Sequence, residues 1–217
     1  MSDAAQCFYG RWARLYDRLA DLPGLRSWRA QTAAMLDLTP GEIVVEMGCG
    51  TGANVPHLRE QVGQSGCVVG IDLTREMLTQ ARTHPERVGR GVDYVQADAT
   101  RPPVDDADSV LATFVVGMFD DPAPAVERWC DLVGPGGQVA LLNFQRSDHA
   151  LAAPLNLAFE GFVRLSSPGG RLSRSSHAAA FERRVNRARE ALAERTEQRR
   201  FETFAGGYLG VLVGRVE

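Results

Sequence analysis

The chain has 217 residues, of which 44% are hydrophobic and 24% charged, and its formal net charge is −3. This composition is typical of a globular domain that can bury a core without disulfides, and it argues against a disordered chain. All 24 basic residues are arginine. Mechanisms that require a lysine, such as a Walker-type phosphate loop or a Schiff base, are therefore excluded.

The four cysteines are scattered, with no Cys-x-x-Cys pair, so we expect neither a metal site nor a redox pair. The N-terminus lacks a basic region followed by an apolar stretch, and no apolar run approaches the roughly 20 residues of a membrane span. We therefore expect a cytoplasmic protein.

Positive charge is concentrated late in the chain. Residues 161–200 contain ten arginines and four glutamates, a net +6, whereas residues 1–160 carry a net −8. Such an asymmetry can mark a surface for anionic partners, including an anionic membrane. A solvated, arginine-rich helix face is the more ordinary interpretation.

The first two thirds of the chain alternate between short apolar runs and helical patterns. Residues 8–37 have helical periodicity, interrupted by Pro23-Gly24. The β-branched and apolar runs that follow predict strands at 43–47, 68–71, 93–96, 109–116 and 138–144, with helices at 75–82 and around 126–132. Strands that alternate with helices in this way indicate right-handed crossovers and a parallel sheet.

The last third predicts an apolar helix at 150–166, an amphipathic helix at 181–200, and a hairpin of residues 201–204 and 208–216. We therefore predict a single α/β domain over residues 1–217. Its core would be a Rossmann-like doubly wound seven-stranded sheet, mostly parallel, with an antiparallel C-terminal hairpin strand. Residues 1–38 would form a helical cap, and residues 146–200 a lid followed by the arginine-rich helix.

The most informative motif is the segment 46–53, Glu-Met-Gly-Cys-Gly-Thr-Gly-Ala, which follows a predicted strand. Glycines there let the backbone turn sharply and approach a ligand closely, and the N-terminus of the next helix favours an anionic group. The spacing of Gly48, Gly50 and Ala53 also satisfies a permissive dinucleotide-binding pattern. The glycine loop alone therefore leaves both NAD and S-adenosylmethionine (SAM) open.

Three acidic residues narrow the choice. Asp72 ends the second strand, where a carboxylate can accept hydrogen bonds from both ribose hydroxyls of either cofactor. Asp98 follows the third strand, where it can accept a hydrogen bond from an adenine amino group. Glu46 adds a buried strand acid beside the amino-acid end of a ligand. Each acid alone has an ordinary explanation as a cap or loop residue, but their register with the strands favours SAM.

These motifs resemble, in order, those of the class I SAM-dependent methyltransferases. The resemblance covers residues 45–52, 70–72, 96–99 and 134–137. It implies that the glycine loop holds the methionine moiety, that Asp72 holds the ribose and that Asp98 holds the adenine amine. The cofactor contacts that it implies are Glu46, Gly48, Cys49, Gly50, Gly52, Asp72, Leu73, Met77, Asp98, Ala99 and Thr113.

A narrower resemblance concerns the ends of the chain. Residues 9–17 are similar to the N-terminal Tyr-Asp helix of the ubiquinone/menaquinone C-methyltransferases and the bacterial phospholipid N-methyltransferases, and residues 204–209 to the terminal hairpin of the quinone group. In those families the N-terminal helix covers the cofactor, and a tyrosine can lie near the transferred methyl group. Tyr16 is therefore a candidate catalytic residue. Residues 146–200 depart from the quinone pattern, which leaves the acceptor open.

Ligands of open α/β sheets lie beyond the carboxyl ends of the strands, which places residues 114–119 and 143–149 beside the methyl acceptor. His149, next to Asp148, is the candidate general base, with a solvent-exposed loop histidine as the equal alternative. The apolar residues 151–159 form either a substrate lid or a helix packed into the core. A lid of this character predicts a small hydrophobic or amphipathic acceptor, either a quinone precursor or a lipid amine.

Two other functions remain to be weighed. A catalytically silent SAM-binding protein that acts through a partner would keep the same cofactor residues. An NAD-dependent oxidoreductase is disfavoured by the missing lysine, by Asp98 and by the turn at 134–137. The acidic composition, with a pI of about 5.9, gives no indication of a nucleic-acid substrate. The sequence does not fix the atom methylated or the oligomeric state.

Overall fold

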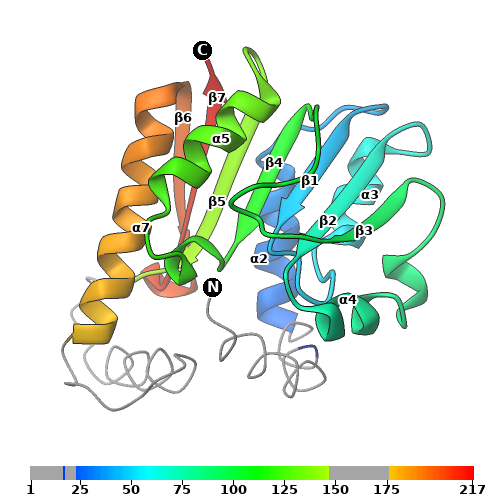
Figure 1. The fold of residues 1–217 in the computed structure, drawn as a ribbon, viewed down its shortest axis with the longest axis horizontal. Coiled ribbons are helices and arrows are strands. Elements are labelled where there is room, and N and C mark those ends of the chain that lie inside the picture. Colours follow the sequence, from blue (N-terminus) through cyan, green and yellow to red (C-terminus); the bar gives the residue numbers. More distant parts are fainter. Residues whose placement is uncertain (1–16, 18–22, 147–175) are drawn as a thin grey trace.

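The computed structural model describes residues 17, 23–146 and 176–217, and its strands form one sheet (Figure 1). The strands are β1 (Ile43–Met47), β2 (Cys67–Asp72), β3 (Val92–Gln96), β4 (Ser109–Thr113), β5 (Gln138–Phe144), β6 (Thr196–Phe204) and β7 (Leu209–Val216). Their order is β3-β2-β1-β4-β5-β7-β6. The first five run parallel, and β7 runs antiparallel to β5 and β6. The predicted seven-stranded, Rossmann-like sheet with an antiparallel C-terminal hairpin is confirmed.

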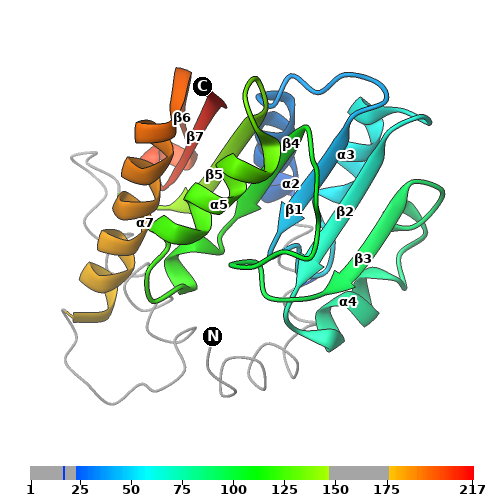
Figure 2. The same cartoon turned by 45° about the horizontal axis from the view of Figure 1, so that its top comes forward.

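Helices cover both faces of the sheet (Figures 1 and 2). They are α2 (Pro23–Ala34), α3 (Val55–Val62), α4 (Arg75–Ala81), α5 (Ala123–Val133) and α7 (Ser176–Arg195), with short 3-10 turns η1 (Pro85–Arg87), η2 (Val116–Met118) and η3 (Ala205–Gly207). One core cluster joins α5 and α7 to the sheet and includes the buried Trp129 and Leu192. A second joins α2 and α3 to the other face and includes Leu36 and Leu58. Burial of these two apolar layers is the main force that holds the helices on the sheet.

The parallel registers bring the predicted motifs to one edge of the sheet. Met47, the last residue of β1, pairs with Ile71 of β2 and with Ala112 of β4. Asp72 pairs with Gln96 at the end of β3. The chain winds outward in opposite directions from β1 and β4, and open α/β sheets bind ligands at such a reversal. The loops that follow β1, β2, β3 and β4 therefore surround one place.

The predicted amphipathic helix at 181–200 ends earlier than expected. Helix α7 ends at Arg195, and residues 196–204 form β6. Thr196 is buried and pairs with Val216, while most of the later β6 side chains are exposed. An irregularity between Glu197 and Arg200 breaks the two-residue alternation. Because β6 is a charged edge strand with such a bulge, its sequence lacks the two-residue alternation of apolar and polar side chains that predicts a strand.

Strand β4 is also shorter than the predicted 109–116. It ends at Thr113 because Phe114 has a positive φ of 61°, which an extended strand cannot accommodate. The turn η2 follows. Gly117 of this turn packs against α7, since a Cβ there would lie 2.2 Å from the Phe181 ring. The β4–η2 connection is thus held between the sheet and α7.

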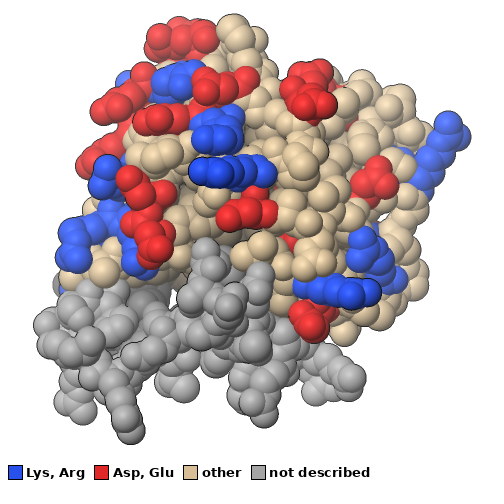
Figure 3. All heavy atoms as spheres, in the orientation of Figure 1, with Lys and Arg blue, Asp and Glu red and all other residues tan. Residues whose placement is uncertain are grey.

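The arginines of α7 are largely engaged with acidic residues of the same molecule. The guanidinium groups of Arg184 and Arg187 lie 3.4 Å and 3.2 Å from the carboxylates of Asp120 and Asp121, which precede α5. Arg195 lies 2.6 Å from an acid of α5, Asp131. Figure 3 shows acidic and basic side chains intermingled on this side of the molecule. The structure therefore favours an internally compensated helix face over a free cationic surface.

Several expectations fall on other parts of the chain. The predicted apolar helix at 150–166 and most of the proposed lid lie outside the described residues, as does most of the cap before Pro23. Within the described ranges, no helix combines the length and the apolarity that crossing a membrane requires.

Candidate functional site

The glycine loop after β1 requires glycine for two separate reasons. Gly48 and Gly52 have positive φ angles of 70° and 77°, where other residues are strained. A Cβ on Gly48 would lie 2.6 Å from a methyl group of Val115, and one on Gly52 would lie 2.4 Å from the Tyr94 oxygen. The loop backbone is therefore packed directly against β3 and against the segment that follows β4.

Asp72 ties this loop to the end of β2. Its Oδ2 accepts a hydrogen bond from the Gly50 N–H at 2.9 Å, and its Oδ1 accepts one from the Thr74 N–H at 2.8 Å. Burial raises the pKa of the Asp72 carboxyl, although the two N–H donors lower it. Each carboxylate oxygen keeps acceptor capacity for a ligand hydroxyl.

The next predicted acid, Asp98, stands at the mouth of the site. It is exposed, and its Oδ1 accepts hydrogen bonds from the N–H and the hydroxyl of Thr100, both at 2.9 Å. The carbonyl of Ala99 accepts a hydrogen bond from the Trp129 indole at 2.8 Å. These bonds fix the peptide that follows Asp98, so the position of the carboxylate is well determined.

These residues line a cavity of about 590 Å³, including the part open to solvent. The predicted cofactor residues on its wall are Gly48, Gly50, Asp72, Leu73, Met77, Asp98, Ala99 and Thr113. The wall also contains Thr74, Phe114, Val115, Met118 and Phe119. Of these, Thr74 was not expected from the sequence.

Three predicted cofactor residues, Glu46, Cys49 and Gly52, are not part of the lining. The Cys49 thiol is buried and lies against Gly70, where a Cβ would be 2.9 Å from its sulfur. Burial raises the pKa of this thiol well above its ordinary value, so the side chain stays neutral. Backbone groups of Cys49 and Gly52 remain the parts of these residues that a ligand could contact.

Glu46 belongs to a buried polar cluster at the ends of β1 and β4. Its Oε1 accepts a hydrogen bond from the Asn54 amide, which also donates to the Thr113 hydroxyl at 3.0 Å. Arg29 of α2 donates from Nη1 to Asn54 Oδ1 at 3.2 Å. Burial raises the pKa of Glu46 to about 7, although the Asn54 hydrogen bond and the Arg29 charge lower it. Arg29 and Asn54 were missed because neither belongs to a recognisable sequence motif.

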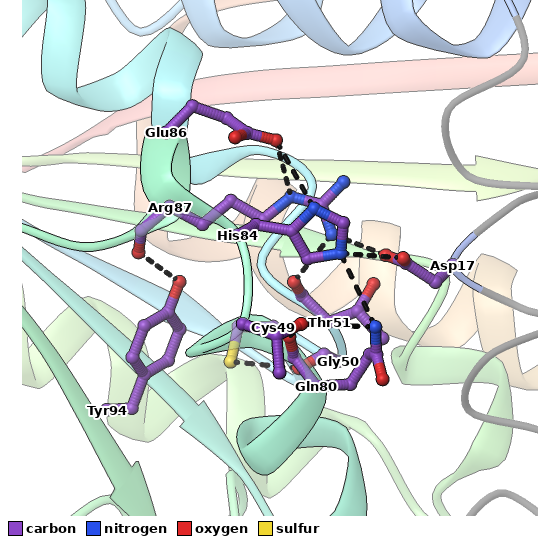
Figure 4. A network of polar contacts seen from close by, with 10 residues as sticks. Asp17, Cys49, Gly50, Thr51, Gln80, His84, Glu86, Arg87 and Tyr94 are labelled. Atoms are coloured by element: carbon purple, nitrogen blue, oxygen red, sulfur yellow. Dashed lines mark hydrogen bonds and ion pairs between the residues drawn. The ribbon is translucent and has the colours of Figure 1, made fainter.

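A second polar network reaches the loop from the N-terminal segment (Figure 4). The buried Arg87 of η1 donates from Nη1 both to Asp17 and, at 3.0 Å, to the Thr51 carbonyl of the glycine loop. His84 Nε2 lies 2.8 Å from the Asp17 carboxylate. Burial alone would raise the pKa of Asp17, but its interactions with Arg87, Thr51 and His84 together outweigh burial and lower the pKa. Asp17 is thus linked to the glycine loop through one guanidinium group.

The sequence of the chain is similar to sequences of known proteins. Residues 45–141 match the family model described as a methyltransferase domain. A phosphatidylethanolamine N-methyltransferase of Cereibacter sphaeroides is 32% identical over 163 residues, covering 70% of this chain and 73% of that protein. The chain belongs to the class I SAM-dependent methyltransferases. This assignment removes the NAD-dependent oxidoreductase from consideration.

Other similarities agree with membership of this methyltransferase family. The 2-phytyl-1,4-beta-naphthoquinone methyltransferase of Arabidopsis thaliana chloroplasts is 28% identical over 159 residues, or 69% of this chain. The matches span between 36% and 61% of the length of the first curated relatives. The fold is that of a SAM-dependent methyltransferase from Thermotoga maritima, with a TM-score of 0.67 at 18% identity over 98% of this chain and 100% of that one.

The chain's own atoms fit the cofactor of this methyltransferase family. Backbone groups of Gly48 and Gly50 line the cavity, where a ligand can approach them without an intervening side chain. Among the described residues, Glu46 Oε2 and Arg29 Nε are buried without a hydrogen-bond partner. An acid and a base left unsaturated beside the cavity are suited to the ammonium and carboxylate groups of a methionine moiety.

The two candidate catalytic residues of this methyltransferase, His149 and Tyr16, lie outside the described residues. The titratable side chains on the described wall are Asp72 and Asp98, and both accept hydrogen bonds from backbone N–H groups. Carboxylates oriented in this way are suited to accepting hydrogen bonds from ligand hydroxyl or amino groups.

Proposed function

We propose that the protein transfers a methyl group from SAM to a small hydrophobic or amphipathic acceptor, and that this acceptor is an aromatic, quinone-type precursor. The observation that carries the proposal is the apolar wall beyond β4, which consists of Phe114, Val115, Met118 and Phe119. The Phe114 ring also stacks on Phe144, with ring centroids 4.4 Å apart. A planar apolar acceptor would find aromatic surface there.

The cofactor orientation follows from the acids. In this proposal Asp72 accepts hydrogen bonds from the ribose and Asp98 accepts one from the adenine amine, with Leu73 and Met77 beside the ring. The methionine end then points toward Gly48 and the ends of β1 and β4. That direction brings the reacting methyl group toward Phe114 and the apolar wall.

SAM, held by Asp72, Asp98 and the glycine loop, would supply a methyl group on a sulfonium: the acceptor's electron pair would form the new bond to the methyl carbon as the C–S bond breaks and S-adenosylhomocysteine leaves. The protein's task is to hold the two reactants in line and to exclude water, which is worth up to about 7–11 kcal/mol at ideal orientation. An acceptor that arrives protonated would also need a base. His149 and Tyr16 are our candidates for that role.

The relatives support two acceptor classes. The Arabidopsis relative is named for a naphthoquinone and the Cereibacter relative for an aminophospholipid. The aromatic wall favours the first class. A lipid amine would gain from cationic surface near a membrane, but α7 arginines such as Arg184 and Arg187 already face acids of their own molecule.

The proposal is tested by incubating the purified protein with SAM and either a short-chain naphthoquinol, a simple phenol or phosphatidylethanolamine vesicles. Product formation is followed by mass spectrometry. We expect methylated naphthoquinol, and we expect Phe114→Ala to raise the KM for this acceptor while the Kd for SAM stays within about twofold. Methylation of phosphatidylethanolamine but not of the naphthoquinol would show that the acceptor is a lipid amine and not a quinone precursor. Tight SAM binding without any turnover would favour the catalytically silent SAM-binding protein.

A further inference from the structure

Arg29 is an arginine in an unusual place. It belongs to α2, and only 5% of it is exposed. Arginine is rarely buried to this extent without a paired acid, because the charge loses its hydration. Within the described part of the chain, no carboxylate lies within ion-pair distance of it: the nearby Glu46 is reached only through Asn54. The guanidinium charge is therefore buried but incompletely compensated.

The contacts of Arg29 lead to the cofactor cavity. Its Nη1 donates to Asn54 and makes a longer contact of 3.5 Å with the hydroxyl of Thr113, which lines the cavity. Its guanidinium carbon lies 5.4 Å from the ring centre of Phe114, another lining residue. Its Nε has no hydrogen-bond partner in the described residues. The guanidinium is thus anchored through one nitrogen beside the wall and keeps donor capacity.

We propose that Arg29 binds the carboxylate of the methionine moiety of SAM. The inference rests on the proposed function, because it needs the methionine end of the cofactor to lie at the ends of β1 and β4. The ionisable residues of the described wall, Asp72 and Asp98, are acids that suit the ribose and the adenine. Arg29 supplies the opposite charge at the other end, in the fork geometry that a carboxylate matches.

The hydrogen bonds around Arg29 explain how one small cluster can bind both the ammonium and the carboxylate of the methionine moiety. Asn54 holds Glu46 through its Nδ2 and Arg29 through its Oδ1, so the acid and the base stay separated on either side of one amide. In this arrangement Glu46 is left to interact with the cofactor ammonium and Arg29 with the carboxylate. Direct pairing of the two side chains would have neutralised both.

The test compares SAM with decarboxylated SAM, which keeps the sulfonium and the amine but lacks the carboxylate. Both are titrated by calorimetry into the wild type, into Arg29→Gln and into the control Arg26→Gln, an exposed arginine of the same helix. We expect Arg29→Gln to weaken SAM binding by about 10- to 100-fold and to leave decarboxylated SAM within about twofold. Arg26→Gln should leave both affinities unchanged.

If Arg29→Gln weakened the binding of SAM and of decarboxylated SAM equally, or changed neither affinity, the assignment would be overturned. Arg29 would then have a structural role alone. If Arg29→Gln does not fold, Arg29→Lys answers the same question. Loss of the fork should weaken SAM selectively, and an equal effect on both ligands would again refute the proposal. A wild type that binds neither ligand would instead refute the proposed function, which keeps the two failures distinct.

Discussion

The phenol of Tyr94 closes the space beneath Gly52. A Cβ on Gly52 would lie 2.4 Å from the Tyr94 oxygen, and that oxygen donates a hydrogen bond to the Arg87 carbonyl at 2.7 Å. Arg87 in turn donates to Asp17 and to the glycine loop at Thr51. One tyrosine of β3 therefore supports both the loop and the network that links it to the N-terminal segment.

We expect Gly52→Ala to destabilise the protein by about 2–4 kcal/mol, because it combines a positive φ with a steric collision. The free energy of unfolding in urea measures the effect. Gly134→Ala is the matched control, since Gly134 also has a positive φ but no atom within 4 Å of its Cβ position. Its cost should be near 1 kcal/mol. Adding Tyr94→Phe to Gly52→Ala should recover part of the loss, and a strictly additive double variant would refute the contact.

Asp72→Asn should weaken SAM binding by about 10- to 100-fold. An asparagine can keep only one of the two backbone hydrogen bonds, because its amide nitrogen cannot accept one from Gly50 or Thr74. Calorimetric titration with SAM measures the loss. The exposed Asp105→Asn serves as the control and should bind like the wild type. Unaltered affinity in Asp72→Asn would show that this carboxylate neither holds the ribose nor positions the loop.

The raised pKa of Glu46 predicts that the stability of the protein depends on pH. Because its pKa is raised to about 7 in the folded state, the folded protein holds a proton that the unfolded chain releases near its ordinary value of 4.5. Stability should therefore fall as the pH rises from about 4.5 to 7 and level off above that range. Relative to the wild type, Glu46→Gln should gain roughly 2–4 kcal/mol over the same range. Urea unfolding at a series of pH values checks this, and parallel profiles would contradict it.

Asp17→Asn should destabilise the protein by about 3–5 kcal/mol at neutral pH, because it removes the carboxylate that pairs with the buried Arg87. The pKa of Asp17 is lowered, so its contribution is complete above the unfolded value near 4 and disappears as the pH falls through the lower folded value. Thermal and urea unfolding at pH 7 and pH 3 measure the difference. Glu86→Gln, at a half-exposed acid that also faces His84 and Arg87, should cost under about 1 kcal/mol.

The sequence predicted the sheet because its signals are local. Apolar runs such as 43–47 and 138–144 are bounded by turns and can be recognised one at a time. An acid at the end of a strand is placed as soon as that one strand is predicted. Asp72 and Asp98 were therefore found without knowledge of their neighbours. The boundary between α7 and β6 was misplaced because the edge strand is charged and bulged, so its side chains show no two-residue period.

The polar clusters could not be predicted in the same way. Asp17 and Arg87 are 70 positions apart, and Arg29 and Thr113 are 84 apart, so only the folded chain brings them together. An arginine in an amphipathic helix ordinarily faces solvent, and nothing in the sequence around Arg29 indicates burial. The positive φ of Phe114 is equally hidden, because glycine and asparagine are the residues that usually mark such a turn.

In the described part of the chain, β6 is the last strand at one edge of the sheet, and its composition bears on whether that edge can pair with another copy. Glu197, Arg199, Arg200 and Glu202 are exposed along it, and the ring of Phe201 is partly covered by the Arg189 guanidinium, 5.2 Å from its centre. A neighbour that tried to extend the sheet would have to desolvate these charges and follow the bulge at Gln198. Among the described residues, these features disfavour the pairing of this edge with a second copy of the sheet.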